Sequence, residues 1–229
     1  MTDKQPIPDA DPADAQLDRQ EAWIVDAAEV TFGDRIDVAE RFVEHLVTTG
    51  IEWGLLGPRE IPKMWDRHVL NCAVVHELLP KGTVVADVGS GAGLPGIALA
   101  IVRPDVQFIL IEPLERRVDW LDMVIEDLGL ENVDVIRARS EQVFETVDVD
   151  VVTARAVSAM KSLVPMTVPL LHGDGQLLAV KGQSAANEIE KADKVLRKFK
   201  TKDAEVLTVG DELLAVPTTV ARLTYGSSR

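Results

Sequence analysis

"VADVGSGAGLPGIALA", residues 85–100, places four glycines within eight positions, between two apolar runs. The first run is typical of a buried β-strand and the second of a buried helix. Gly89, Gly91 and Gly93 leave the backbone free to adopt positive φ and to approach a ligand closely. Pro95 suits the start of the helix, whose free N–H groups favour an anion. We therefore predict a strand–loop–helix unit that binds a cofactor.

Seven short segments rich in β-branched residues follow Gly82, and helical patterns separate the first of them from one another. This alternation predicts an α/β fold whose parallel sheet is covered by helices on both faces. The last two segments, 204–209 and 218–225, have no clear helix between them. We therefore expect a sheet of seven strands with a closing hairpin and one antiparallel strand.

Three regions differ in texture along the chain. Residues 1–17 are rich in Pro, Asp and Ala, so we expect a disordered acidic tail. Residues 18–80 carry apolar side chains at three- and four-residue steps, broken by turn signals, which predicts a helical N-terminal region of three or four helices. Residues 81–229 form the predicted Rossmann-like domain.

The composition of the 229 residues excludes several classes of protein. Apolar residues make up 46% of the chain, but no run reaches the roughly 18 residues of a membrane span, and no signal peptide is expected. Cys72 is the single cysteine, so no internal disulfide can form, which fits a cytoplasmic location. The net charge of −14 does not exclude a nucleic-acid partner, because residues 1–40 hold eleven acids against three bases.

Carboxylates at the ends of the first two strands indicate which cofactor the loop binds. "GAGLPG" matches G-x-G-x-x-G, a pattern also found in dinucleotide sites. However, Asp87 would repel a nearby pyrophosphate and would suit a cationic ligand such as S-adenosylmethionine. Glu112, about twenty residues beyond the glycines, is placed to bind ribose hydroxyls. Ser140 and Glu141 follow the third strand, where they could meet the adenine edge.

Five motifs together resemble one family over about residues 20–225. They are "WDRHVLNC" (65–72), "DVGSGAGLPGIALAIVRPD" (87–105), "ERR" (115–117), "TARA" (153–156) and "AVKGQ" (179–183). The combination is similar to the bacterial 16S ribosomal RNA guanine-N7 methyltransferases, also called glucose-inhibited division protein B. The Trp-rich helical region resembles the actinobacterial branch. Asn71 and Cys72 depart from the Asp-Ser that is usual in the family.

The resemblance implies a class I methyltransferase fold, with S-adenosylmethionine as cofactor. It implies that the acceptor is a guanine N7 near the decoding centre of 16S ribosomal RNA, in the small subunit or its assembly intermediate. It also implies that loss of activity gives low-level streptomycin resistance. Carried over by position, cofactor contacts fall on Gly89, Leu94, Ser140, Glu141 and Arg155.

The residues present restrict the chemistry of the acceptor. Cytosine C5 methylation needs a cysteine nucleophile, and Cys72 lies before the sheet domain. "TARAVS" lacks the proline and aromatic residues that adenine amino-group methylation often uses. A guanine N7 has a free lone pair and needs no general base. This fits the four histidines, none of which falls at the expected site: His45, His68, His76 and His172.

Several basic residues are candidates for holding the RNA. Arg155 and Lys181 end strands at the edge where open α/β sheets bind ligands, so we expect them on phosphates or on the guanine O6. Alternatively, they form ion pairs with Asp87 or Glu112. The other candidates are Arg116, Arg117, Arg137 and Arg139, together with the run 191–202, and each of them could instead be a solvated charge.

Two further functions stay open at this point: a small-molecule methyltransferase in which the helical region forms a lid, and a non-catalytic nucleotide-binding module.

His68 is expected to form a structural hydrogen bond between helices. No His/Cys cluster has the spacing of a metal site. We expect a monomer. We also expect that the protein requires the folded ribosomal particle, because an acidic chain with 4% aromatic residues should bind free RNA poorly.

Overall fold

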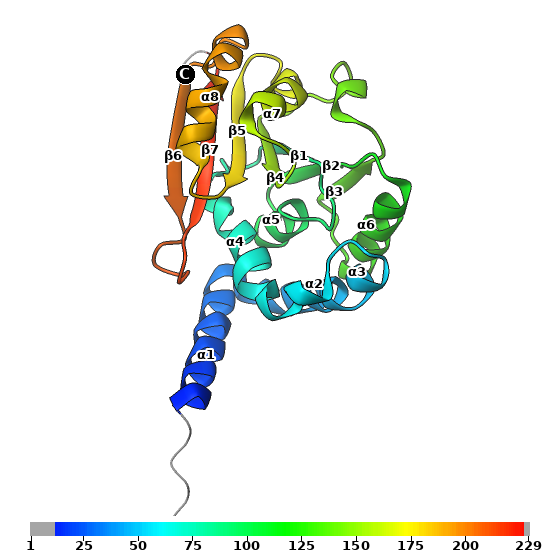
Figure 1. Ribbon diagram of the computed structural model, residues 1–229. Coiled ribbons are helices and arrows are strands. Elements are labelled where there is room, and N and C mark those ends of the chain that lie inside the picture. Colours follow the sequence, from blue (N-terminus) through cyan, green and yellow to red (C-terminus); the bar gives the residue numbers. More distant parts are fainter. Residues whose placement is uncertain (1–11, 227–229) are drawn as a thin grey trace, which may run out of the picture.

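The computed structural model describes residues 12–226, with side chains from residue 22 onward (Figure 1). Residues 1–11 of the expected tail lie outside the described residues. Residues 12–17 of that tail belong to helix α1 (Pro12–Phe32). Ala13, Ala15 and Leu17 are good helix formers, which accounts for a helix where the composition alone indicated disorder.

A seven-stranded sheet in the order β3-β2-β1-β4-β5-β7-β6 is the centre of the fold. Strands β1 to β5 are parallel, whereas β7 runs antiparallel between β5 and β6. The prediction of seven strands with one antiparallel strand is therefore confirmed. The strands are β1 (Val84–Val88), β2 (Gln107–Ile111), β3 (Val133–Ile136), β4 (Val151–Arg155), β5 (Gly175–Lys181), β6 (Asp203–Val209) and β7 (Thr218–Tyr225).

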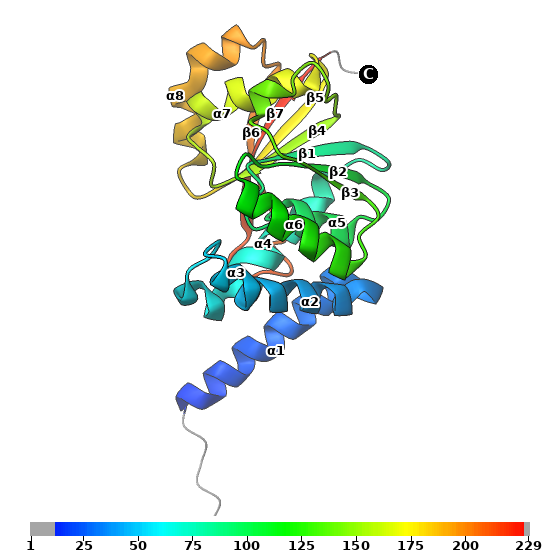
Figure 2. The same ribbon diagram turned by 90° about the vertical axis from the view of Figure 1, so that its right-hand side faces the viewer.

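Helices cover both faces of the sheet, as Figure 2 shows. Helices α5 (Gly96–Val102) and α6 (Glu115–Leu128) pack on one face, and α7 (Met160–Thr167) and α8 (Ala185–Lys198) on the other. Successive strand residues alternate between the two cores: Val85 belongs to the first, and Ala86 to the second. Two short 3-10 helices, η5 (Ser140–Gln142) and η6 (Val168–Leu171), complete the sheet domain.

The N-terminal helical region extends the core on the α5/α6 face. Phe42 and Leu46 of α2 are fully buried in this core, and Trp120 of α6 donates its indole N–H to Thr49 Oγ1 at 3.0 Å. The region therefore packs on the sheet domain, and α1 leads away from it (Figure 2). After α1 it comprises η1 (Gly33–Arg35), α2 (Ile36–Val47), α3 (Thr49–Glu52), η2 (Pro58–Lys63), η3 (Met64–Val69), α4 (Leu70–Ala73) and η4 (Val74–Leu78).

Candidate active site

The glycine loop between β1 and α5 adopts the conformation that its sequence predicts. Gly89, Gly91 and Gly93 have φ values of +74°, +58° and +76°, which L side chains rarely adopt. At Gly96 the limit is space, because a Cβ there would lie 2.3 Å from Leu110 Cδ2. The loop therefore lies tightly on the carboxyl ends of the strands.

Asp87 is buried under this loop and hydrogen-bonds to it. Its side chain is fully buried and accepts hydrogen bonds from the Gly96 N–H at 3.2 Å and from Thr153 Oγ1 at 3.0 Å. The anion at the start of α5 is thus the protein's own carboxylate. Burial raises the pKa of Asp87 to about 6, although the hydrogen bonds that it accepts oppose the rise.

Glu112 follows β2 and is held from two sides. Its Oε2 accepts the Gly91 N–H at 3.0 Å, and its Oε1 accepts the Leu114 N–H at 3.1 Å. Arg117 Nη1 lies 3.5 Å from Oε2. The side chain is 2% exposed, yet it lines a cavity, and its carboxylate retains lone pairs for a ligand hydroxyl.

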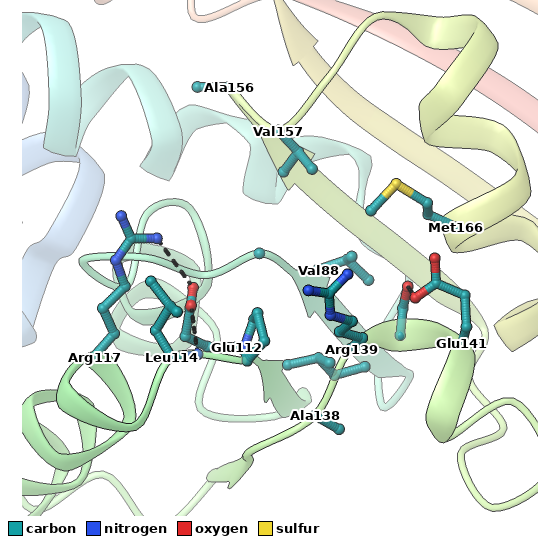
Figure 3. A pocket seen from close by; sticks show the side chains of 14 residues that line it. Val88, Glu112, Leu114, Arg117, Ala138, Arg139, Glu141, Ala156, Val157 and Met166 are labelled. Atoms are coloured by element: carbon teal, nitrogen blue, oxygen red, sulfur yellow. Dashed lines mark hydrogen bonds and ion pairs between the residues drawn. The ribbon is translucent and has the colours of Figure 1, made fainter.

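The cavity has a volume of about 430 Å³ and lies at the carboxyl ends of β1 to β4. Figure 3 shows Glu112, Leu114 and Arg117 on one side, Arg139, Glu141 and Met166 on another, and Ala156 and Val157 above them. The size falls within the range of small-molecule sites. Its lining residues are Val88, Gly89, Ile111, Glu112, Pro113, Leu114, Arg117, Ala138, Arg139, Ser140, Glu141, Ala156, Val157 and Met166.

The structure brings four of the predicted cofactor residues together on this wall: Gly89, Glu112, Ser140 and Glu141. Gly91 takes part through the N–H that it donates to Glu112. Asp87 lies beneath the loop, and Leu94 is buried, so direct cofactor contacts by these two residues stay predictions.

The apolar part of the cavity wall was not predicted from the sequence. Leu114 and Val157 each follow a strand end by a few residues, a position that could have signalled a ligand contact. Met166 lies inside α7, and only the tertiary structure brings it to the cavity. Together with Val88 and Ile111, these side chains form an apolar surface that suits a flat ring.

Arg155, the last residue of β4, is directed at the N-terminal helical region. Its Nη2 lies 2.5 Å from His68 Nδ1, and its Nη1 lies 2.9 Å from Cys72 Sγ and 3.2 Å from the His68 carbonyl oxygen. The alternative prediction for Arg155, an ion pair with Asp87 or Glu112, is wrong, because its partners are His68 and Cys72. The contact of Arg155 with cofactor or RNA stays a prediction.

Lys181, at the end of β5, is also engaged within the protein. Its Nζ lies 2.9 Å from Glu188 Oε2 and 2.6 Å from the Ser158 carbonyl oxygen. Burial disfavours the Glu188 carboxylate, but the hydrogen bonds from Lys181 and from the Met160 N–H outweigh it and lower the pKa of Glu188. The alternative prediction, an ion pair of Lys181 with Asp87 or Glu112, is therefore wrong, because the partner of Lys181 is Glu188. Binding of RNA by Lys181 stays a prediction.

The other candidate cations are distributed around the cavity. Arg117 and Arg139 line it, whereas Arg137 is exposed and pairs with Glu115. Arg116 is exposed at the start of α6, and its guanidinium lies near Gly54 of the helical region. The run 191–202 lies on α8 and the turn after it, with its lysines exposed. Which of these side chains contact RNA stays a prediction.

Within residues 12–226, none of the helices is long and apolar enough to span a membrane. In the same part of the chain, no group of three or more His, Cys, Asp or Glu side chains is arranged to hold a metal ion.

The strand order, the antiparallel β7 and the cavity beside the glycine loop define the class I S-adenosylmethionine-dependent methyltransferase fold. Solved structures support this assignment. TYW2 from M. jannaschii, solved in complex with AdoMet, has a TM-score of 0.54 and 20% identity, covering 72% of this chain and 78% of that one. An O-methyltransferase from Thermotoga maritima has a TM-score of 0.54 and 20% identity, covering 74% of this chain and 71% of that one. The predicted fold class is confirmed.

Sequence relatives are far closer. A model of the family described as rRNA small subunit methyltransferase G matches residues 35–215. "Ribosomal RNA small subunit methyltransferase G" of Pseudarthrobacter chlorophenolicus is 61% identical over 197 residues, which cover 86% of this chain and 91% of the relative. The namesake of Thermobifida fusca is 48% identical over 199 residues, 87% of this chain and 84% of the relative. The chain belongs to the rRNA small subunit methyltransferase G family, as the resemblance predicted.

Proposed function

We propose that this protein transfers a methyl group from S-adenosylmethionine to N7 of a guanine in 16S ribosomal RNA near the decoding centre. The observation that carries the proposal is the cavity beside the glycine loop in a chain that belongs to this family. The small ribosomal subunit, or its assembly intermediate, would be the substrate particle, and the cytoplasm the place of action. Loss of the protein would give low-level streptomycin resistance.

The cavity fits the cofactor in shape and in chemistry. A Cβ at Gly89 would lie 2.9 Å from Val157 Cγ2, so a side chain there would fill the space beside the wall. Glu112 offers a fixed carboxylate for ribose hydroxyls, and Ser140 and Glu141 offer polar atoms for the adenine edge. When bound, S-adenosylmethionine supplies an electrophilic methyl group.

The wall also suits an acceptor that needs no general base. The titratable residues among the described lining residues are Glu112, Arg117, Arg139 and Glu141, and Glu112 is already hydrogen-bonded. A guanine N7 reacts through a free lone pair, so catalysis would consist of orientation and exclusion of water. Orientation of this kind can contribute roughly 7–11 kcal/mol to lowering the barrier.

The position of the helical region argues against a small-molecule enzyme with a lid. All fourteen lining residues of the cavity lie between residues 88 and 166, so within the described residues the helical region contributes none. Instead, this region packs on the α5/α6 face of the sheet. An open cavity is suited to a base presented by a large partner.

Two experiments test the proposal. Reverse-transcription mapping of N7-methylguanine on 16S RNA from cells with and without the gene should reveal one lost site near the decoding centre, and the purified protein should restore it. An unchanged map would overturn the substrate assignment. Calorimetry should detect binding of S-adenosylhomocysteine and none of NAD; the reverse result would favour the nucleotide-binding module.

A further inference from the structure

A chain of hydrogen bonds joins the helical region to the end of β4. Glu60 Oε2 lies 2.8 Å from His68 Nε2, and His68 Nδ1 lies 2.5 Å from Arg155 Nη2. Glu60 belongs to η2 and His68 to η3, whereas Arg155 is separated from His68 by 87 positions in the sequence. The contact is therefore a product of the tertiary fold.

The donors and acceptors in this chain have a single consistent arrangement. A guanidinium group can only donate, so His68 Nδ1 must accept and carries no proton. The remaining proton of the neutral ring is on Nε2, where it is donated to Glu60. Arg155 and Glu60 together select one tautomer of His68.

The residues that follow Arg155 form part of the cavity wall. Ala156 and Val157 line the cavity, and Ala156 has a φ of +54°, an uncommon value for a residue with a side chain. A backbone in this conformation persists when its surroundings hold it. The bonds of Arg155 to His68 and Cys72 are the anchor immediately before it.

We propose that His68 is a positioning residue for the methyl transfer, which, with Glu60 behind it, holds Arg155 and the adjoining wall residues Ala156 and Val157 in place for the acceptor base. This inference rests on the proposed function. It assigns to the "WDRH" stretch a role at the cavity, although that stretch contributes no lining residue among those described.

Protonation of His68 would break this arrangement. Burial and the charge of Arg155 lower the pKa of His68, while the hydrogen bond to Glu60 opposes them. A proton on Nδ1 would place two donors face to face, so Arg155 would be released at acid pH. Other charged or titratable groups surround this series of hydrogen bonds. They are Asp66 beside His68, Lys63 beside Glu60, Cys72 against Arg155 and Asp87 near Cys72.

Two substitutions distinguish the role of His68 Nδ1 from that of His68 Nε2. In His68→Asn the amide oxygen takes the place of Nδ1 and can still accept from Arg155, but it cannot reach Glu60. In His68→Gln the amide reaches the place of Nε2 and leaves Arg155 Nη2 without its acceptor at Nδ1. His76→Asn is the matched control, because His76 is a half-buried histidine on η4 that is outside this hydrogen-bond chain.

The assay measures kcat and KM on small subunits from cells that lack the gene, together with S-adenosylhomocysteine affinity and melting temperature. We expect His68→Asn to retain kcat within about threefold and His68→Gln to lose at least about tenfold, since small misplacements are costly to catalysis. His68→Asn should bind S-adenosylhomocysteine as the wild type does. The acid fall of kcat should move to lower pH in His68→Asn, where position 68 no longer titrates.

The possible outcomes distinguish a failure of this inference from a failure of the proposed function. Equal losses in the two variants, losses explained by melting temperature, or an acid limb that does not move in His68→Asn would overturn the inference while leaving the proposed function intact. A wild-type protein that binds S-adenosylhomocysteine but does not methylate the particle would overturn the proposed function and, with it, the role of His68.

Discussion

The carboxylate of Glu112, after β2, accepts a hydrogen bond from the backbone N–H of Gly91, in the loop after β1, at 3.0 Å. One buried acid thereby joins the two strand ends between which the cofactor is expected to lie. The same carboxylate receives the Leu114 N–H at 3.1 Å. The shape of the loop and the hydroxyl-binding wall are therefore not independent of each other.

Glu112→Gln should weaken S-adenosylhomocysteine binding by about 10- to 100-fold, because an amide NH₂ would oppose one of the two backbone donors and a charge-assisted hydrogen bond would be lost. Isothermal calorimetry measures the effect. Glu115→Gln, a nearby exposed acid, is the matched control and should bind normally. Equal affinities in wild type and Glu112→Gln would contradict the assignment.

Gly96→Ala should destabilise the protein by about 1–3 kcal/mol, the usual range for overpacking. The added Cβ would meet Leu110 Cδ2 at 2.3 Å and Asp87 Oδ2 at 2.8 Å, which forces the loop away from the strands. Urea unfolding measures the change, and cofactor affinity should fall in the same variant. Gly57→Ala has open space and a φ of −89°, so it should leave stability unaltered; comparable losses in both variants would argue against the tight contact.

Asp87 should make stability depend on pH. Its pKa in the folded protein, about 6, lies above the ordinary 3.8, so the folded state binds the proton more tightly. The resulting stabilisation is fully present below about pH 4 and is lost as the pH rises through about 6. The difference between the two values corresponds to about 3 kcal/mol at most.

Asp87→Asn should flatten this pH dependence, because the amide oxygen can accept the Gly96 N–H while the Thr153 hydroxyl turns to accept from the NH₂ group. Urea unfolding between pH 4 and 8 measures it, with Asp134→Asn, an exposed strand residue, as control. A wild-type slope that persists in Asp87→Asn would assign the pH dependence to another group.

The exposed cations beside the cavity wall, Arg116 and Arg137, should serve RNA binding. Combining Arg116→Ala with Arg137→Ala should raise KM for the small subunit about tenfold with little change in S-adenosylhomocysteine affinity, and the effect should diminish at high salt. Lys191→Ala with Lys194→Ala on α8 is the matched pair. A larger effect from the α8 pair would move the RNA-binding surface to that helix.

The folded particle should be a much better substrate than free RNA. A chain with net charge −14 and 4% aromatic residues has little to bind an unstructured strand. Parallel assays on small subunits and on a protein-free 16S transcript measure the ratio of kcat/KM, which should exceed about tenfold. Equal turnover on the two substrates would refute this expectation.

The local pattern of the sequence determined the seven strands, the antiparallel β7 and the glycine loop, because each depends on near neighbours: period-two alternation, turn residues and positive φ at Gly89, Gly91 and Gly93. The position of Glu112 at a strand end was predictable for the same reason. The family motifs added the class of enzyme.

Only the tertiary structure decided what the charged groups at the strand ends contact. Arg155 could equally have paired with Asp87 or Glu112 on sequence grounds, yet the helical region brings His68 and Cys72 to it from more than eighty residues away. Asp87 is buried beneath the loop, and Lys181 pairs with Glu188. Strand ends converge whatever their sequence separation, so the sequence determines which charges gather there, and three-dimensional packing determines which of them pair.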